Sequence, residues 1–292
     1  MRIKIGQVII DVLRGKRQLI KKQPVTINYV ELSITSRCTL CCKDCWHLMP
    51  HYLFNKTGLS KGGDVSLSYC KRTVDNLLKS VDHINNFCIL GGEPLLHKDC
   101  AQIIEYLTTQ SKITNVRVIT NATISPNQEI INAMKHEKVY IEISDYGDLS
   151  RKKEEMLAIF KANNIKNSLR LAVEGGWNDI GQPVANNRDV SENLKIFSEC
   201  SVRHCQLILD GKIFICPRSA HGINLGLHKN VKEEYVDLNK GTPWLRKKQI
   251  KKLYELQVVP SCDYCNGSSG PPIKAAIQLS AQDILTLKNE SR

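Results

Sequence analysis

The residues best suited to chemistry in this chain are its cysteines, because most of them fall in three groups. Twelve cysteines in 292 residues is about 4% of the chain, below the roughly 8–10% of disulfide scaffolds. In a large chain without a secretion signal, clustered thiolates more often hold metal or do redox chemistry than form disulfides. The groups are Cys38, Cys41, Cys42 and Cys45; Cys200, Cys205 and Cys216; and Cys262 with Cys265.

The first group contains two overlapping spacings. One is a CxxxCxxC spacing made by Cys38, Cys42 and Cys45, and the other is a pair of adjoining CxxC units, Cys38/Cys41 and Cys42/Cys45. Two CxxC units that share one zinc ion need an intervening segment of roughly a dozen residues or more, so that they can face each other. Because these units adjoin, the sequence favours the three-cysteine spacing.

This spacing directly follows a strand predicted at 29–34, and the motif Gly91-Gly92-Glu93-Pro94 directly follows a second strand predicted at 87–90. The two motifs together resemble the radical S-adenosylmethionine (radical SAM) superfamily. The resemblance implies that Cys38, Cys42 and Cys45 bind three irons of a [4Fe–4S] cluster and leave the fourth iron open to SAM. It also implies reductive cleavage of SAM to a 5′-deoxyadenosyl radical that abstracts hydrogen from a substrate, with a flavodoxin or ferredoxin type electron donor.

The same resemblance implies a set of SAM-binding residues at the carboxyl ends of strands, where α/β sheets bind ligands. Glycines without Cβ would let the backbone approach the methionine part of SAM, and the glutamate would accept from its amino group. Asn121 and Ser144 suit a cap or turn equally well, and Arg170 suits a surface ion pair equally well. The implied residues are Gly91, Gly92, Glu93, Pro94, Asn121, Ser144 and Arg170.

The later cysteines resemble the SPASM/twitch extension of radical SAM enzymes in its shorter, twitch form. The resemblance implies a second, auxiliary [4Fe–4S] cluster, with Cys205 as a competitor for the first ligand position. A structural zinc held by four thiolates is the alternative on spacing alone. Arg218 and His221 follow Cys216 and are candidates to reach the substrate or the cluster sulfurs, ordinary polar contacts being the alternative. The implied cluster ligands are Cys200, Cys216, Cys262 and Cys265.

Regular alternation of strand-like and helix-like segments predicts the elements that must position these residues. Five strands separated by helices indicate right-handed βαβ units with a parallel sheet, so we expect an α/β fold, a partial (β/α)6 barrel with a small Cys-rich twitch domain. Ser66 and Ser125 are predicted N-caps, and Asp210-Gly211 predicts a β-hairpin. Cys70, Cys88 and Cys100 are expected to be core thiols. The expected divisions are 1–24 (basic segment), 25–190 (core), 191–270 (twitch domain) and 271–292 (tail).

The net charge of +12 is concentrated in residues 1–25 and in the basic stretch 240–252. Neither stretch has the interleaved aromatic residues of a nucleic-acid platform, so we expect solvated helix faces and no nucleic-acid partner. The sequence has no apolar run long enough to span a bilayer and no signal peptide, which predicts a cytoplasmic protein.

We expect a radical SAM oxidoreductase that oxidises a sugar, cyclitol or sugar nucleotide with help from the auxiliary cluster. No recognisable leader-binding segment precedes the core, which favours a small molecule over a peptide. Modification or epimerisation of a peptide is the alternative within the superfamily. A zinc-binding, nucleic-acid-associated module is the alternative from another class.

Overall fold

The computed structural model describes residues 24–54, 63–172 and 177–290, so nearly all of the predicted basic segment lies outside the described residues. Eight strands form one sheet in the order β5-β4-β3-β2-β1-β7-β8-β9, and β6 pairs with β10 in a small second sheet. The strands are β1 (Thr26–Ser33), β2 (His83–Leu90), β3 (Ile113–Thr120), β4 (Val139–Asp145), β5 (Asn167–Leu171), β6 (Trp177–Asn178), β7 (Gln206–Leu209), β8 (Lys212–Phe214), β9 (Tyr235–Asp237) and β10 (Pro272–Ile273).

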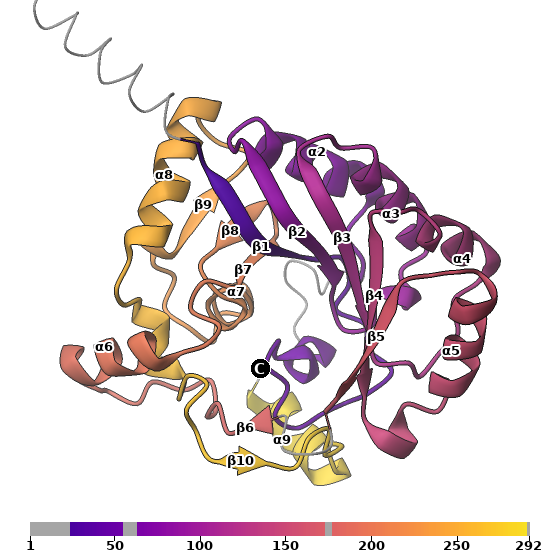
Figure 1. Cartoon of the computed structure of the whole chain (residues 1–292). Helices are drawn as coiled ribbons and strands as arrows, with labels where there is room; N and C mark the ends of the chain where they lie inside the picture. Colours follow the sequence, from indigo (N-terminus) through magenta and orange to yellow (C-terminus); the bar gives the residue numbers. More distant parts are fainter. Residues whose placement is uncertain (1–23, 55–62, 173–176, 291–292) are drawn as a thin grey trace, which may run out of the picture.

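Strands β1 to β5 and β7 are parallel, which confirms the predicted α/β fold with a parallel sheet. The sheet curls, and the helices that follow β1 to β4 cover its convex side (Figure 1). The helices are α2 (Leu67–Leu78), α3 (Cys100–Thr108), α4 (Gln128–Met134), α5 (Lys153–Ala162), α6 (Val190–Glu199), α7 (Pro217–Asn224), α8 (Pro243–Glu255) and α9 (Ala281–Glu290), with 3-10 turns η1 (Met49–Leu53), η3 (Pro94–Leu96), η4 (Gly147–Leu149), η5 (Lys232–Glu234) and η6 (Pro260–Tyr264).

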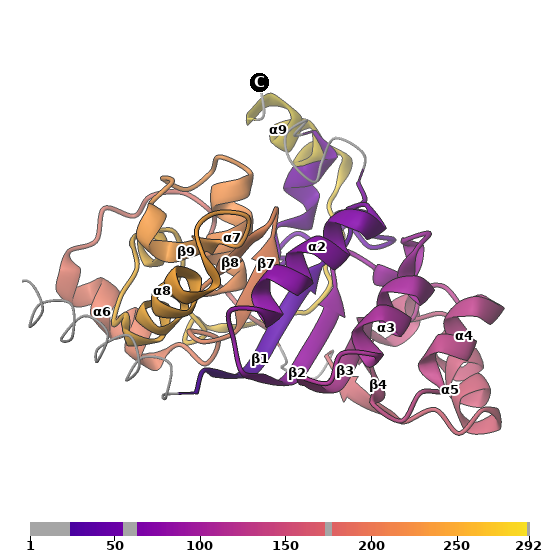
Figure 2. The same ribbon diagram turned by 90° about the horizontal axis from the view of Figure 1, so that it is seen from above.

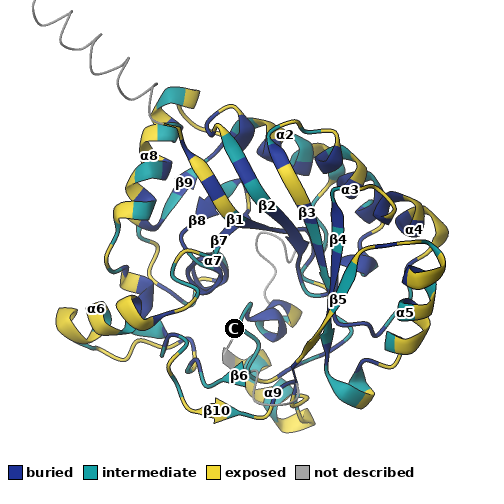
Figure 3. Ribbon diagram, viewed as in Figure 1, coloured by how far each residue is buried: buried dark blue, intermediate teal, exposed yellow. Residues whose placement is uncertain are grey.

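The two faces of the curled sheet differ in chemistry. Successive side chains of a strand point to opposite faces, so Val30 and Leu32 of β1 join the apolar core under the helices, whereas Glu31 faces the concave side. Figure 3 shows the buried layer between sheet and helices. The predicted core thiols Cys70, Cys88 and Cys100 are buried, at 2%, 0% and 0% exposure, which confirms that prediction.

Helix ends follow local capping chemistry, with one correction to the prediction. The Ser66 side chain accepts from the backbone N–H of Tyr69, as expected for the cap of α2. The predicted cap Ser125 is wrong: α4 begins after Asn127, whose side chain accepts from the N–H of Ile130. Asn is as good an N-cap as Ser, and the Ser125 hydroxyl instead donates to Glu155.

The predicted hairpin is present, and it extends the main sheet. Asp210 and Gly211 have φ angles of 47° and 69°, the left-handed pair that a type I′ turn requires, and β7 pairs with both β8 and β1. The sheet therefore runs across the boundary predicted near residue 190, and the division into domains stays a prediction.

Two side chains of the basic stretch 240–252 contact the segment between α2 and β2. In α8 the buried Arg246 donates to Ser80, and Lys247 forms an ion pair with Asp82 at 2.6 Å. None of the helices in the described part of the chain combines the length and apolar character needed to cross a membrane.

The turn after β2 lies directly against the segment that follows β1. A Cβ on Gly91 would stand 2.3 Å from the Thr35 carbonyl oxygen, and one on Gly92 would stand 2.2 Å from that of Arg37 and 2.8 Å from Cys38 Cβ. The glycines are therefore needed for contact between the two predicted motifs themselves.

We expect Gly92→Ala to lower the free energy of unfolding by about 1–3 kcal/mol, because overpacking forces the backbone apart. Urea denaturation measures this change. A Cβ on Gly226 would meet no atom within 4 Å, although its φ is +74°, a conformation that Asn tolerates, so Gly226→Asn is the control. Equal stability of Gly92→Ala and wild type would contradict the expectation.

Candidate active site

Three of the four cysteines in the first group share one packed environment. Cys38, Cys42 and Cys45 belong to an apolar cluster with Leu40 and Ala276 beyond the carboxyl end of β1. Burial raises the pKa of the Cys42 thiol to about 12, and the neighbouring Cys45 acts in the same direction. Thiolates buried this close together need a cation to remain charged, and an iron–sulfur cluster supplies one. The donor set therefore fits the group that the resemblance implies.

Hydrogen-bond donors already point at these sulfurs. The backbone N–H of Leu40 donates to Cys38 Sγ at 3.4 Å, and the side-chain amide of Asn121 donates to the same sulfur at 3.7 Å. The side-chain amide of Gln278 donates to Cys42 Sγ at 3.7 Å. Such N–H···S contacts stabilise thiolate ligands and influence cluster potential.

Glu93 ties the GGEP turn to the neighbouring strand. Its fully buried carboxylate accepts from the Leu95 N–H at 3.1 Å, the Thr120 hydroxyl at 2.9 Å and the Asn121 N–H at 2.8 Å. Burial raises the pKa of Glu93 to about 7, while these donors act in the opposite direction. Through Asn121, the carboxylate is linked to Cys38, so the structure brings three predicted site residues together. A contact from Glu93 to SAM stays a prediction.

The remaining predicted SAM-binding residues have no hydrogen bond to the cysteine loop among the described contacts. Pro94 is buried at the start of η3, next to Glu93. Ser144 lies opposite Arg170 in the β4–β5 register. Arg170 is exposed and forms an ion pair with Glu142 at 3.8 Å, which is the alternative that the sequence left open for it.

The segment after β10 covers the cysteine loop. The prediction of 271–292 as a tail did not include this contact. The Lys43 N–H donates to the Ile277 carbonyl and the Leu279 N–H donates to the Cys41 carbonyl, both at 2.8 Å. Figure 2 shows α9 above the strand ends. The local signal for this contact is the apolar run AAIQL at 275–279.

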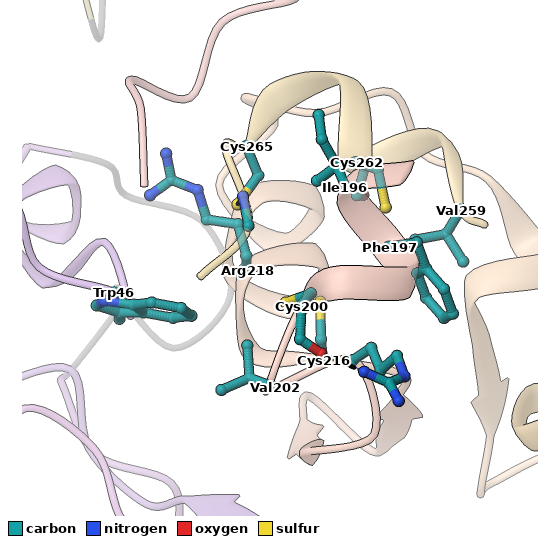
Figure 4. Close-up of a pocket in the computed structure, with 13 residues that line it drawn as sticks. Trp46, Ile196, Phe197, Cys200, Val202, Cys216, Arg218, Val259, Cys262 and Cys265 are labelled. Atoms are coloured by element: carbon teal, nitrogen blue, oxygen red, sulfur yellow. Dashed lines mark hydrogen bonds between the residues drawn. The ribbon is translucent and has the colours of Figure 1, made fainter. Parts of the chain in front are cut away.

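The four predicted auxiliary-cluster ligands line one pocket. Figure 4 shows their sulfurs around this space, with Trp46 and Arg218 on its other side. The Ser219 N–H donates to Cys216 Sγ at 3.4 Å, and the Gly267 N–H donates to Cys265 Sγ at 3.2 Å. This donor set also fits an iron–sulfur cluster. The ligands are Cys200, Cys216, Cys262 and Cys265.

Cys205 belongs to a different environment from the pocket. It lies where the concave face meets β7, and its thiol interacts with Glu31 and Cys88. Cys205 does not line the pocket, although its thiol is near enough to Cys216 to interact with it. Among the described residues, no group of three or more His, Cys, Asp or Glu side chains is arranged around the position of a single metal ion.

A second set of buried polar groups lies on the concave face, beside the cysteine loop. His47 follows Cys45, and its ring lies 5.2 Å from that of His221 and its Nε2 lies 3.7 Å from Glu31 Oε2. Glu31 is 5% exposed and burial raises its pKa to about 7. Its Oε1 accepts from the Tyr29 hydroxyl at 3.1 Å, whereas its Oε2 and the Nε2 of His221 are both buried without a hydrogen-bond partner among the described groups.

The protonation of His221 follows from its neighbours. The Tyr52 hydroxyl donates to Asn224 Oδ1 at 3.1 Å. A tyrosine hydroxyl has only one hydrogen to donate. Its oxygen therefore accepts from His221 Nδ1 at 2.9 Å. Burial holds the pKa of His221 well below its usual value. The ring is therefore neutral, and its Nε2 is a hydrogen-bond acceptor that faces the interior without a donor.

Comparison with known proteins gives the following similarities. The chain is 34% identical over 104 residues to an S-adenosylmethionine-dependent nucleotide dehydratase of Selenomonas ruminantium, which covers 35% of this chain and 32% of that protein. It is 29% identical over 180 residues to a GTP 3′,8-cyclase of Syntrophomonas wolfei subsp. wolfei, which covers 55% of this chain and 51% of that protein. The chain thus matches a third to a half of the length of these curated relatives.

The fold is similar to that of native anSMEcpe with bound AdoMet and Cp18Cys peptide, with a TM-score of 0.51, 13% sequence identity, and coverage of 92% of this chain and 96% of that chain. Residues 32–211, which hold the three-cysteine loop and the GGEP turn, match the sequence profile of the radical SAM superfamily. This chain therefore belongs to the radical SAM superfamily.

Proposed function

We propose that this protein cleaves SAM reductively and uses the resulting radical to oxidise a hydroxyl-bearing small molecule. Cys38, Cys42 and Cys45 would hold the SAM cluster. When bound, that cluster supplies the electron that splits SAM into methionine and a 5′-deoxyadenosyl radical, which abstracts hydrogen from the substrate. The support is the shared packing of the three thiols and their link through Asn121 to the GGEP turn.

A second [4Fe–4S] cluster held by Cys200, Cys216, Cys262 and Cys265 would make the net reaction an oxidation, because it can accept the electron of a substrate radical. The proposal of a second cluster rests on the pocket that the four cysteines share with Trp46, the chain neighbour of Cys45. A twitch domain is the corresponding family assignment. Electrons would enter from a flavodoxin or ferredoxin type donor.

The substrate class follows from the acceptors on the concave face. A buried acceptor without a donor costs about 1–3 kcal/mol, so Glu31 Oε2 and His221 Nε2 favour a ligand that supplies O–H or N–H groups. Sugars, cyclitols and sugar nucleotides all do so. The two curated relatives are named for action on nucleotides, which contain a sugar, and this supports the same class.

We expect alanine at Cys38, Cys42 or Cys45 to abolish 5′-deoxyadenosine formation, because each removes one of three cluster ligands. Chromatography of anaerobic reactions with SAM and dithionite measures the product. Cys41→Ala is the matched control, because Cys41 lies outside the apolar cluster that holds the other three and should retain product formation. Loss of product in Cys41→Ala, with Cys42→Ala active, would show that Cys41 is the ligand in place of Cys42 and that the CxxxCxxC register is wrong.

We expect the anaerobically purified protein to hold about eight irons, two [4Fe–4S] clusters, and Cys200→Ala to lose about four of them. Cys205→Ala should keep all of them, since its thiol lies at Glu31. Iron, sulfide and zinc analysis measures this. With both clusters present, a substrate from a panel of cyclitols, amino sugars and sugar nucleotides should become two mass units lighter while SAM is consumed.

Zinc without a brown chromophore would refute both clusters and favour the zinc-binding module. A product of unchanged mass would refute the oxidation and favour an epimerase.

We expect Glu31→Gln to raise the free energy of unfolding at pH 8 by on the order of 3 kcal/mol. The pKa of Glu31 rises from 4.5 to about 7 in the folded protein, so ionisation opposes folding and stability falls as pH rises between these values. The gain should therefore be small at pH 5. Urea denaturation at both pH values measures it.

Glu142→Gln is the matched control, because Glu142 lies on the same concave face but pairs with Arg117 and Arg170. It should not stabilise the protein at pH 8. A Glu31→Gln protein that gains no more stability over wild type at pH 8 than at pH 5 would mean that burial does not disfavour the Glu31 carboxylate.

A further inference from the structure

Arg218 is a buried cation two residues after Cys216, in the first turn of α7. Its side chain lines the pocket of the four cysteines, and the residue is only 4% exposed. One terminal nitrogen donates to the Gly181 carbonyl at 2.5 Å, while Nε is buried without a hydrogen-bond partner among the described groups. Figure 4 shows the side chain beside Cys265, with its guanidinium directed to the side of the pocket on which Trp46 lies.

The charge of Arg218 lacks a directly paired carboxylate. In the described part of the chain, no Asp or Glu oxygen lies within ion-pair distance of its guanidinium. The carboxylate of Asp179 favours the charged form of Arg218. The charge of Arg218 in turn acts to lower the pKa of Asp44. Burying a cation without a countercharge costs several kcal/mol, so the site needs further negative charge.

Arg218 lines the pocket together with Cys216 and Cys265 of the second set and with Trp46, which directly follows Cys45 of the first set. Burial lowers the pKa of Arg218, and Cys265, Cys45 and Cys216 act in the opposite direction. Cys45 belongs to the loop of the first set, whereas Cys216 and Cys265 belong to the pocket of the second. Thiolate-ligated iron–sulfur clusters are anions, and each one-electron reduction adds a further negative charge to them.

We infer that Arg218 is a positioning residue whose charge is shared by the two clusters and raises the reduction potential of both. The inference rests on the proposed function, since it requires both clusters. A fixed positive charge in a site of low dielectric stabilises the reduced, more negative form of each cluster. Because the same cation faces both sets, its removal should affect both potentials in the same direction.

The test is a potentiometric titration of the anaerobic protein without SAM, followed by electron paramagnetic resonance of each reduced cluster. We expect Arg218→Gln to lower the midpoint potential of both clusters. The one-electron reduction equilibrium of each should change at least tenfold, which corresponds to about 59 mV. Arg218→Lys keeps the charge and should shift each equilibrium less than tenfold.

Arg203→Gln is the matched control. Arg203 lines the same pocket and donates to the Cys200 carbonyl at 2.9 Å, but it is only half-buried, and solvent screens exposed charges. Its removal should shift only the auxiliary cluster, by less than Arg218→Gln does. If Arg203→Gln lowered the midpoint potentials of both clusters as much as Arg218→Gln does, this result would contradict a specific role for Arg218.

The outcomes separate the inference from the proposed function. A wild-type protein with one cluster would refute the auxiliary cluster and the inference together. Two clusters in wild type with unchanged potentials in Arg218→Gln would refute the inference alone. If circular dichroism shows that Arg218→Gln is unfolded, Arg218→Met replaces it as the variant without the charge: a tenfold or larger change in the reduction equilibrium of both clusters supports the inference, and unchanged equilibria contradict it.

Discussion

The buried carboxylate of Glu93 is the constraint on which the arrangement of the site depends. It gathers two backbone N–H groups and one hydroxyl from the turn after β2 and the end of β3. Asn121, one of those donors, then contacts Cys38 through its side chain. Because Gly91 and Gly92 admit the backbone of 35–38 on the other side, the GGEP turn is held between the cysteine loop and the sheet. A shift of this turn would move Cys38.

The concave face of the sheet contrasts with the core that supports it. Under the helices, alternate residues of each strand form one continuous apolar core, which supplies most of the stabilising burial. On the concave side, Glu31 and His221 are buried and His47 is half-buried. Loss of water raises the pKa of the carboxyl and lowers the pKa values of the two rings. Groups with such shifts cluster at functional sites. Burial of the apolar core under the helices therefore offsets the unfavourable free energy of burying polar groups on the concave side.

The two cysteine sets are neighbours in space although about 150 residues of chain separate them. Strand β7 pairs with β1, and this pairing brings the hairpin, α7 and Cys216 beside the strand that leads into the first cysteine loop. Trp46, the chain neighbour of Cys45, lines the pocket of the second set together with Arg218. The C-terminal segment lies against the first cysteine loop through backbone hydrogen bonds to Cys41 and Lys43.

The sequence by itself determined the parallel α/β sheet, most helix positions, the hairpin at Asp210-Gly211 and the three core thiols, because these depend on local periodicity, capping and turn chemistry. It also identified the two motifs that place the chain in its superfamily. Only the tertiary structure decided that Cys200 faces the pocket while Cys205 faces Glu31, that Arg170 pairs with Glu142, and that residues 275–279 cover the cysteine loop. These are contacts between residues far apart in the chain, and no local pattern encodes which of several similar side chains the folded sheet will bring together.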